Sequence, residues 1–173
     1  PSSFSQIKIM KRGKLMQLKG LCSVSNDLEK SHVAERMQKH ARQELFKKFQ
    51  LVPEIKTEYV KTDSSGCGID IAAVYEHTLI GSNALGELGK RSEKVSQEAA
   101  TFLMEQMGSL DEHMTDQIIP YMALASIESK KESEVKTSII SKHTRTNIWV
   151  CENFLPIKFE IDEKEKTIKC NTI

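Results

Sequence analysis

Long apolar runs are missing from this chain of 173 residues. No stretch approaches the roughly 20 apolar residues that a helix needs to cross a membrane, and no signal peptide is visible, so we expect no membrane partner. A basic excess is missing too, because 25 basic residues face 24 acidic ones and leave a net charge of +1. A site for a polyanion must therefore be local. A third interpretation, a bare RNA-binding module, is weakened by this balanced charge and by the absence of aromatic platforms for RNA bases.

Two common ligand motifs are also absent. The four cysteines lack the CxxC spacing of a zinc or redox site, which indicates reduced, partly buried thiols in an intracellular protein: Cys22, Cys67, Cys151 and Cys170. We expect a cytoplasmic location, or a nucleoplasmic one in a eukaryote. The glycine-containing residues 64–68 do not match the P-loop pattern and are typical of a turn between strands.

The residues that are present predict a mixed α/β architecture. The hydrophobic share of 39% and charged share of 28% fit a globular chain with a real core. Apolar residues at every fourth position predict a helix over residues 32–49, and alternation predicts strands at 7–10 and 55–59. Further helices are expected from Ser92, with Phe102 on the core face, and from a capping box at 109–112 to about Ala125. The other expected elements are strands at 15–24, 69–75, 78–81 and 135–141, a loop at 82–91, a helix at 147–154 and a hairpin over 156–170.

One candidate site surrounds His143. It lies between an expected strand and an expected helix start at Asn147, with hydroxyl groups at Thr144 and Thr146. Helix starts gather anions, and a neutral imidazole can act as a nucleophile on phosphorus. Alternatively, His143 is a polar residue that ends a strand and bonds to the backbone.

A second candidate site lies on the helix that contains Pro120. Spacings of three and four residues place His113, Asp116 and Gln117 on one helix face. These side chains could contact a base, ribose, phosphate or metal, or simply form a solvated face. No ligand spacing supports a zinc site of His113, Asp116 and His143, so metal ligands stay unassigned. Pro120 interrupts the helix and frees a carbonyl group.

The two sites together resemble the RNA 3′-terminal phosphate cyclase family. Residues 111–120 and the pattern Ser-x-His-x-x-Thr-Asn-Ile at 141–148 are similar to two motifs of its C-terminal part, and agreement continues through 154–159. Residues 11–14, 32–36 and 84–90 resemble upstream landmarks in family order. The resemblance spans nearly the whole chain.

The resemblance implies a fold in which βαβαββ repeats carry an inserted thioredoxin-like α/β domain. Residues 1–11 correspond to the strand that leads into the insert, 12–104 to the insert, and 105–173 to most of the last repeat. The family's N-terminal glycine-rich segment, phosphate-binding arginines and metal-binding glutamate have no counterpart here. We therefore expect the chain to be the C-terminal half of the family's protein, and the missing N-terminal half, in the same or a separate chain, to be its partner. The family's Gly-Gly-Gly signature would lie just upstream of Pro1.

The resemblance also implies an activity. His143 would take AMP from ATP as adenylyl-histidine and pass it to an RNA 3′-phosphate, which then closes to a 2′,3′-cyclic end. A divalent cation, Mg or Mn, would offset the triphosphate charge. The implied nucleotide-binding residues are His113, Asp116, Gln117, Thr146 and Asn147. The alternative is the family's non-catalytic branch of ribosome-assembly factors, which is expected to lack the nucleophilic histidine.

Overall fold

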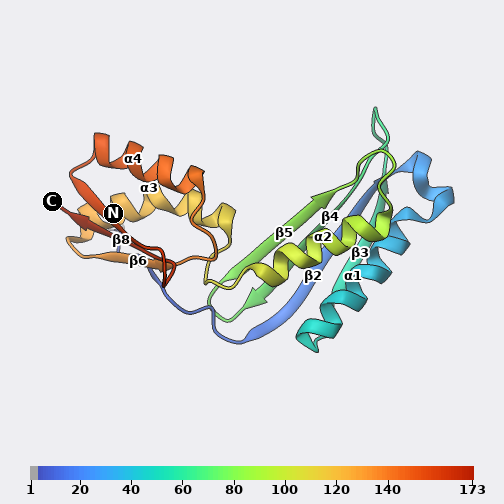
Figure 1. Ribbon diagram of the computed structural model, residues 1–173, viewed down its shortest axis with the longest axis horizontal. Coiled ribbons are helices and arrows are strands. Elements are labelled where there is room, and N and C mark those ends of the chain that lie inside the picture. Colours follow the sequence, from blue (N-terminus) through green and yellow to red (C-terminus); the bar gives the residue numbers. More distant parts are fainter. Residues whose placement is uncertain (1–3) are drawn as a thin grey trace. The chain divides into compact units, whose positions relative to one another are not determined.

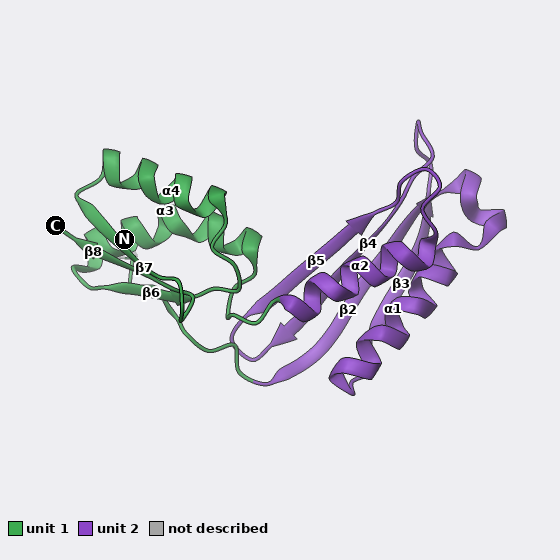
Figure 2. Ribbon diagram, in the orientation of Figure 1, with its two compact units in different colours: residues 1–13, 106–173 green, residues 14–105 purple. Residues whose placement is uncertain are grey.

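The computed structural model describes residues 4–173, which form two units (Figures 1 and 2). Unit 1 takes in the chain up to Gly13 and then Gln106–Ile173, and unit 2 is Lys14–Glu105. The first three residues of the strand expected at 1–11 lie outside the described residues. No helix among the described residues is long and apolar enough to span a membrane.

Unit 2 has a thioredoxin-like arrangement. Its elements are β2 (Leu15–Ser25), a short 3₁₀ helix η1 (Asn26–Ser31), α1 (Val33–Phe49), β3 (Glu54–Val60), β4 (Cys67–Tyr75), β5 (Leu79–Leu85) and α2 (Ser92–Glu105). The sheet order is β3-β2-β4-β5, with β2 and β3 parallel and β4 antiparallel to both of its neighbours. One βαβ half is thus followed by one ββα half, and α1 and α2 pack together over the sheet (Figure 1).

The α1 helix confirms the four-residue periodicity. Val33, Met37, Ala41 and Leu45 are buried, because each successive position returns to the same helix face. The core face of α2 was predicted partly wrongly. Leu103 is buried there, whereas Phe102 is exposed, since neighbouring residues on a helix point about 100° apart. The expected loop over residues 82–91 is also partly wrong, because β5 continues to Leu85.

Unit 1 has the βαβαββ order. Its elements are β1 (Lys8–Ile9), α3 (Glu112–Ser129), β6 (Ser133–Lys136), α4 (Lys142–Phe154), β7 (Ile157–Asp162) and β8 (Thr167–Thr172). The sheet order is β1-β6-β8-β7, and α3 and α4 cover one of its faces (Figure 1). The β7–β8 pair confirms the expected closing hairpin.

Unit 2 is inserted into a strand of unit 1. β1 runs parallel to β6, with Ile9 paired to Val135, and after the insertion Leu110 resumes this pairing opposite Thr137. The backbone confirms the continuation, because the amide of Leu110 donates to Lys136 and its carbonyl accepts from Ser138. The chain thus leaves the sheet of unit 1 after β1 and forms unit 2. It then pairs with the same neighbouring strand again at Leu110, just before α3 starts.

Two helix starts differ from expectation. The predicted strand at 135–141 ends at Lys136, and α4 begins at Lys142, well before Asn147. α3 is capped by Asp111 instead of Ser109, and it continues past Ala125 to Ser129. Ser109 lies two residues before the N-cap, and its amide donates to the carbonyl of Lys136.

Candidate active site

Both helices of unit 1 start at the same edge of its sheet. The parallel strand segments end at Leu110 and Thr137, and the N-caps Asp111 and Ser141 follow each of them. Each cap accepts a hydrogen bond from the third helical residue, at 2.8 Å for Asp111 and 3.1 Å for Ser141. Ligands of α/β proteins commonly bind outside the carboxyl ends of parallel strands. The two helix starts therefore form a candidate ligand-binding edge.

His143 is the second residue of α4 and its side chain is exposed. The amides of Lys142 and His143 belong to the first turn, where no helix carbonyl is in reach. These amides and the helix dipole favour an anion at this position. The structure thus keeps the histidine at a helix start, but it moves that start from Asn147 to Ser141.

Asp116 joins the two helices. Its Oδ1 atom accepts a hydrogen bond from the hydroxyl of Ser141 at 2.8 Å and another from the hydroxyl of Thr144. Ser141 and Thr144 are buried. The carboxylate on α3 therefore fixes the first turn of α4, which carries His143.

Asn147 makes a second link between the helices. It lies in the second turn of α4, and its Nδ2 donates to the backbone oxygen of Asp116 at 2.8 Å. Pro120, four residues after Asp116, is inside α3 and has no amide hydrogen for that oxygen. Asn147 thus occupies the bonding position that the proline leaves open.

The remaining predicted residues lie on the surface of the same helix pair. His113 is the second residue of α3, and both it and Gln117 are exposed. Thr146 is also exposed and donates its hydroxyl to the carbonyl of Lys142, one turn earlier in α4. All six predicted residues therefore lie on α3 and α4. The side chains of Asp116 and Asn147, however, already form hydrogen bonds between the two helices.

Sequence reasoning placed Thr144 beside His143, but it missed that Ser141 and Thr144 bond to Asp116 and so fix the start of α4. A serine is a usable helix-cap signal, but the threonines that follow it favour strand or loop. The guanidinium of Arg145, two residues after His143, is paired with Glu163. The hydrogen bond from Arg145 lowers the pKa of Glu163. The other basic residue near His143 is Lys142, which directly precedes it in the chain.

Residues 4–173 contain no group of three or more histidine, cysteine, aspartate or glutamate side chains that could hold a metal ion.

The chain combines a βαβαββ unit with a thioredoxin-like insertion and two helix starts at one sheet edge. Residues 10–108 match the insert domain of RNA 3′-terminal phosphate cyclase. A protein of that name from Sulfurisphaera tokodaii is 36% identical over 172 residues, covering 97% of this chain and 48% of the relative. Relatives with the same name from Pyrococcus abyssi and Saccharolobus islandicus are 39% identical over 135 residues and 35% identical over 168 residues. These matches cover 76% and 95% of this chain, and 37% and 46% of the relatives.

The chain therefore belongs to the RNA 3′-terminal phosphate cyclase family. It spans about half the length of the curated relatives it matches.

Proposed function

We propose that this chain is the C-terminal half of an ATP-dependent RNA 3′-terminal phosphate cyclase and that His143 is its nucleophile. The observation that carries the proposal is the exposed imidazole in the first turn of α4, on a helix start fixed by Asp116. A helix start favours the charged phosphates of ATP, and a neutral imidazole is a competent nucleophile near neutral pH.

The reaction has three steps. An imidazole nitrogen of His143 attacks the α-phosphorus of ATP, a P–N bond forms, and the P–O bond to the departing pyrophosphate breaks. An oxygen of the RNA 3′-phosphate then attacks the same phosphorus, and the P–N bond breaks to restore the histidine. Finally the neighbouring 2′-hydroxyl attacks the activated 3′-phosphate, loses its proton to solvent and expels AMP, which leaves a 2′,3′-cyclic phosphate.

The other predicted residues bind and position in this proposal. His113 and Gln117 contact the adenosine from the exposed surface of α3, and Thr146 and Asn147 lie beside the nucleotide on α4. Because Oδ1 of Asp116 already accepts two hydroxyl groups, a direct nucleotide contact by Asp116 uses its other oxygen, Oδ2.

The partners follow from the same proposal. The substrate is RNA with a 3′-phosphate end, and the half of the protein that precedes Pro1 supplies the main phosphate-binding groups. A divalent cation, Mg or Mn, would be held by that half and by triphosphate oxygens, which are common ligands of such ions. The reaction takes place in the cytoplasm, or in the nucleoplasm of a eukaryote.

A second candidate function is a non-catalytic factor in ribosome assembly. That branch of the family is expected to lack the histidine, whereas this chain has His143 in an exposed first-turn position. The presence of this side chain favours the enzyme.

The test is adenylylation of the complete protein with α-labelled ATP and Mg or Mn. His143→Ala and His143→Asn should abolish acid-labile labelling. His77→Ala is the matched control, because His77 is an exposed histidine of unit 2, and it should label normally. His113→Ala should still label but require more ATP. Undiminished labelling of both His143 variants would refute the assignment.

A further inference from the structure

One edge of the sheet of unit 2 has the same layout as the candidate site edge of unit 1. β3 runs parallel to β2, and β5 runs in the same direction because β4 is antiparallel to both β2 and β5. These three strands therefore end at one edge, where α1 and α2 begin (Figure 1). Ligands of α/β proteins commonly bind at such an edge. Unit 2 thus has its own place for a ligand.

A cavity of about 470 Å³ lies at this edge. Its volume falls within the roughly 300–1,000 Å³ of small-molecule sites. The walls come from η1, the start of α1, the turn before β4 and the loop between β5 and α2. The residues that line the cavity are Leu28, Val33, Arg36, 65–67 and 86–92. All of them belong to Lys14–Glu105, so the cavity lies within one compact unit.

The lining of the cavity is positively charged. It contains the three basic residues Arg36, Lys90 and Arg91 but only one acidic residue, Glu87, whereas the whole chain has a net charge of +1. Lys90 is already engaged, because its ammonium group pairs with Glu98 and, at 3.8 Å, with Glu87. The two arginines are therefore the cations that a ligand would meet.

Arg36 and Arg91 converge on one carboxylate. Glu93 in the first turn of α2 lies 3.6 Å from Arg36 of α1 and 3.7 Å from Arg91. Both distances are longer than ordinary hydrogen bonds, so the guanidinium groups keep N–H donors for another anion. A guanidinium group binds a phosphate through two parallel hydrogen bonds. Glu93 thus holds two phosphate-binding groups close together at the cavity.

The remaining lining suits an apolar ring. Leu28 is half-buried and Val33 is buried, whereas Leu88 is fully exposed. Gly66 leaves open space beside its backbone, since a Cβ added there would meet no atom within 4 Å. A flat apolar group in this space would cover Leu88 and remove apolar surface from water. The cavity therefore combines room for a ring with two donors for an anion.

We propose that this cavity binds a nucleoside monophosphate unit, with its phosphate on Arg36 and Arg91. Its base lies against Leu28, Val33 and Leu88. The choice of a nucleotide among phosphorylated ligands rests on the proposed function, in which RNA is the substrate and AMP is released. Free AMP and a nucleotide within RNA present the same base and phosphate, so the experiment has an arm for each.

The experiment uses Cys67 as a reporter, because it lines the cavity and is half-buried. The complete protein with His143→Ala is alkylated with iodoacetamide at about pH 8, the range in which an ordinary thiol begins to ionise, and Cys67 is quantified by peptide mapping. AMP should slow the alkylation of Cys67 about fivefold or more, because ligands of such sites are largely enclosed by the lining. Adenosine and inorganic phosphate should each protect Cys67 far less. An RNA oligonucleotide that protects at lower concentration than AMP would identify RNA as the source of the nucleotide, and the reverse order would identify free AMP.

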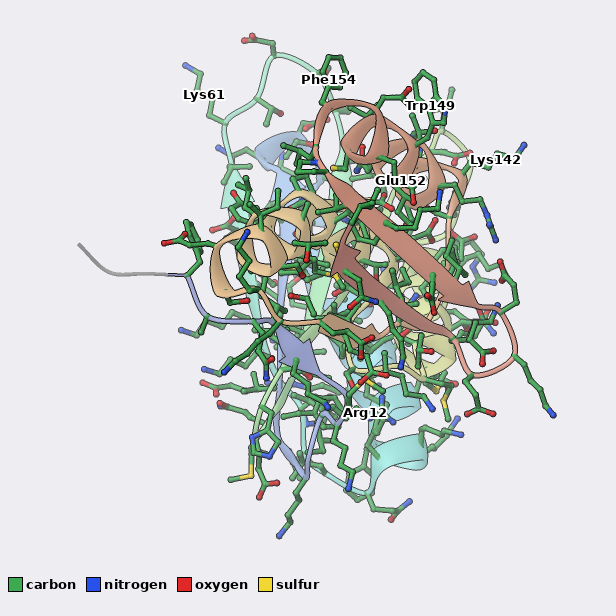
Figure 3. The ribbon with its side chains drawn as sticks, turned by 90° about the vertical axis from the view of Figure 1, so that its left-hand side faces the viewer. Arg12, Lys61, Lys142, Trp149, Glu152 and Phe154 are labelled. Atoms are coloured by element: carbon green, nitrogen blue, oxygen red, sulfur yellow. The ribbon has the colours of Figure 1, made fainter. Side chains whose placement is uncertain are left out.

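The arginines supply the decisive variants. Arg36→Ala combined with Arg91→Ala should raise the AMP concentration needed for protection about tenfold or more, because hydrogen bonds between charged groups are lost. Lys94→Ala and Lys61→Ala are the matched controls and should protect normally, since both lysines are exposed and lie outside the lining. Figure 3 shows Lys61 pointing outward from the turn between β3 and β4. Arginine-to-glutamine substitutions replace the alanines if the double variant fails to fold.

Three results would overturn the proposal. They are alkylation of Cys67 at the same rate with and without AMP or RNA, equal protection by adenosine or inorganic phosphate, and undiminished protection in the double arginine variant. The His143→Ala background separates this test from the proposed function. Protection of Cys67 by AMP stands even if His143 is not the nucleophile, and labelling of His143 stands even if the cavity is empty.

Discussion

Pro120 cannot donate a hydrogen bond to the backbone oxygen of Asp116, and Asn147 bonds to that oxygen instead. The two positions should therefore be coupled. In the natural sequence, Asn147→Ala removes a donor to a carbonyl that has no helix partner, and we expect a loss of about 1–3 kcal/mol of stability. In a Pro120→Ala background the new amide of residue 120 can bond to Asp116, so Asn147→Ala should cost only about 0.5 kcal/mol.

The assay is a double-mutant cycle on urea or thermal unfolding, with an expected coupling of about 1–2 kcal/mol. Each kcal/mol shifts Tm by about 4–8 °C for a unit of this size. Pro120→Ala alone should leave the protein equally stable or more stable, because an interior proline costs about 3 kcal/mol relative to alanine. It should also lower the adenylylation rate of the complete protein, because the link between α3 and α4 weakens.

Asn153→Ala is the matched control. Asn153 lies in the same helix, and its side chain donates to the carbonyl of Trp149 at 2.7 Å, a bond within α4. Its loss should cost little in either background. If Asn147→Ala costs the same with and without Pro120, the carbonyl of Asp116 is not shared as the structure indicates, and the reasoning fails.

Three further predictions concern stability and thiol reactivity. Asp116→Ala should cost about 1.5–3 kcal/mol in urea unfolding, because Ser141 loses its carboxylate acceptor; an unchanged midpoint with weaker ATP use would instead indicate a nucleotide contact. Gly108→Ala should destabilise the protein by about 1–3 kcal/mol in the same assay, because its Cβ would lie 2.1 Å from the backbone carbon of Thr137. With iodoacetamide at about pH 8, Cys67 should react before Cys22, because burial raises the pKa of Cys22 to about 12 and leaves it a thiol; peptide mapping would expose the reverse order.

The elements that could be predicted from sequence are those with a strong local pattern. α1 buries every fourth residue, and β7 and β8 alternate on either side of a polar turn. These signals depend on neighbours in the chain, so the sequence contains them in full. The interrupted strand could not be predicted in this way, because Leu110 continues β1 only through its pairing with Thr137 on another strand.

The start of α4 shows why the site was only partly predictable. Thr144 and Thr146 favour strand or loop by local propensity, yet both lie in the helix. The Asp116 carboxylate on another helix accepts the hydroxyl groups of Ser141 and Thr144, and this tertiary contact fixes the helix start. The family motifs on both helices pointed to the candidate residues. The spacing of residues within one helix, however, could not reveal that Asp116 of α3 bonds to Ser141 and Thr144 at the start of α4.

The motif residues fall into two groups: those whose polar atoms already form hydrogen bonds within the protein, and those whose side chains are exposed. Asp116 uses its carboxylate on Ser141 and Thr144 and its backbone oxygen on Asn147. A ligand that needed these same atoms would have to break the link between α3 and α4. His113, Gln117 and His143 are exposed on the same pair of helices, so a nucleotide could reach their side chains without disturbing that link. The scaffold residues therefore explain why the helix starts are fixed, and the exposed residues are the ones from which direct loss of nucleotide chemistry is expected.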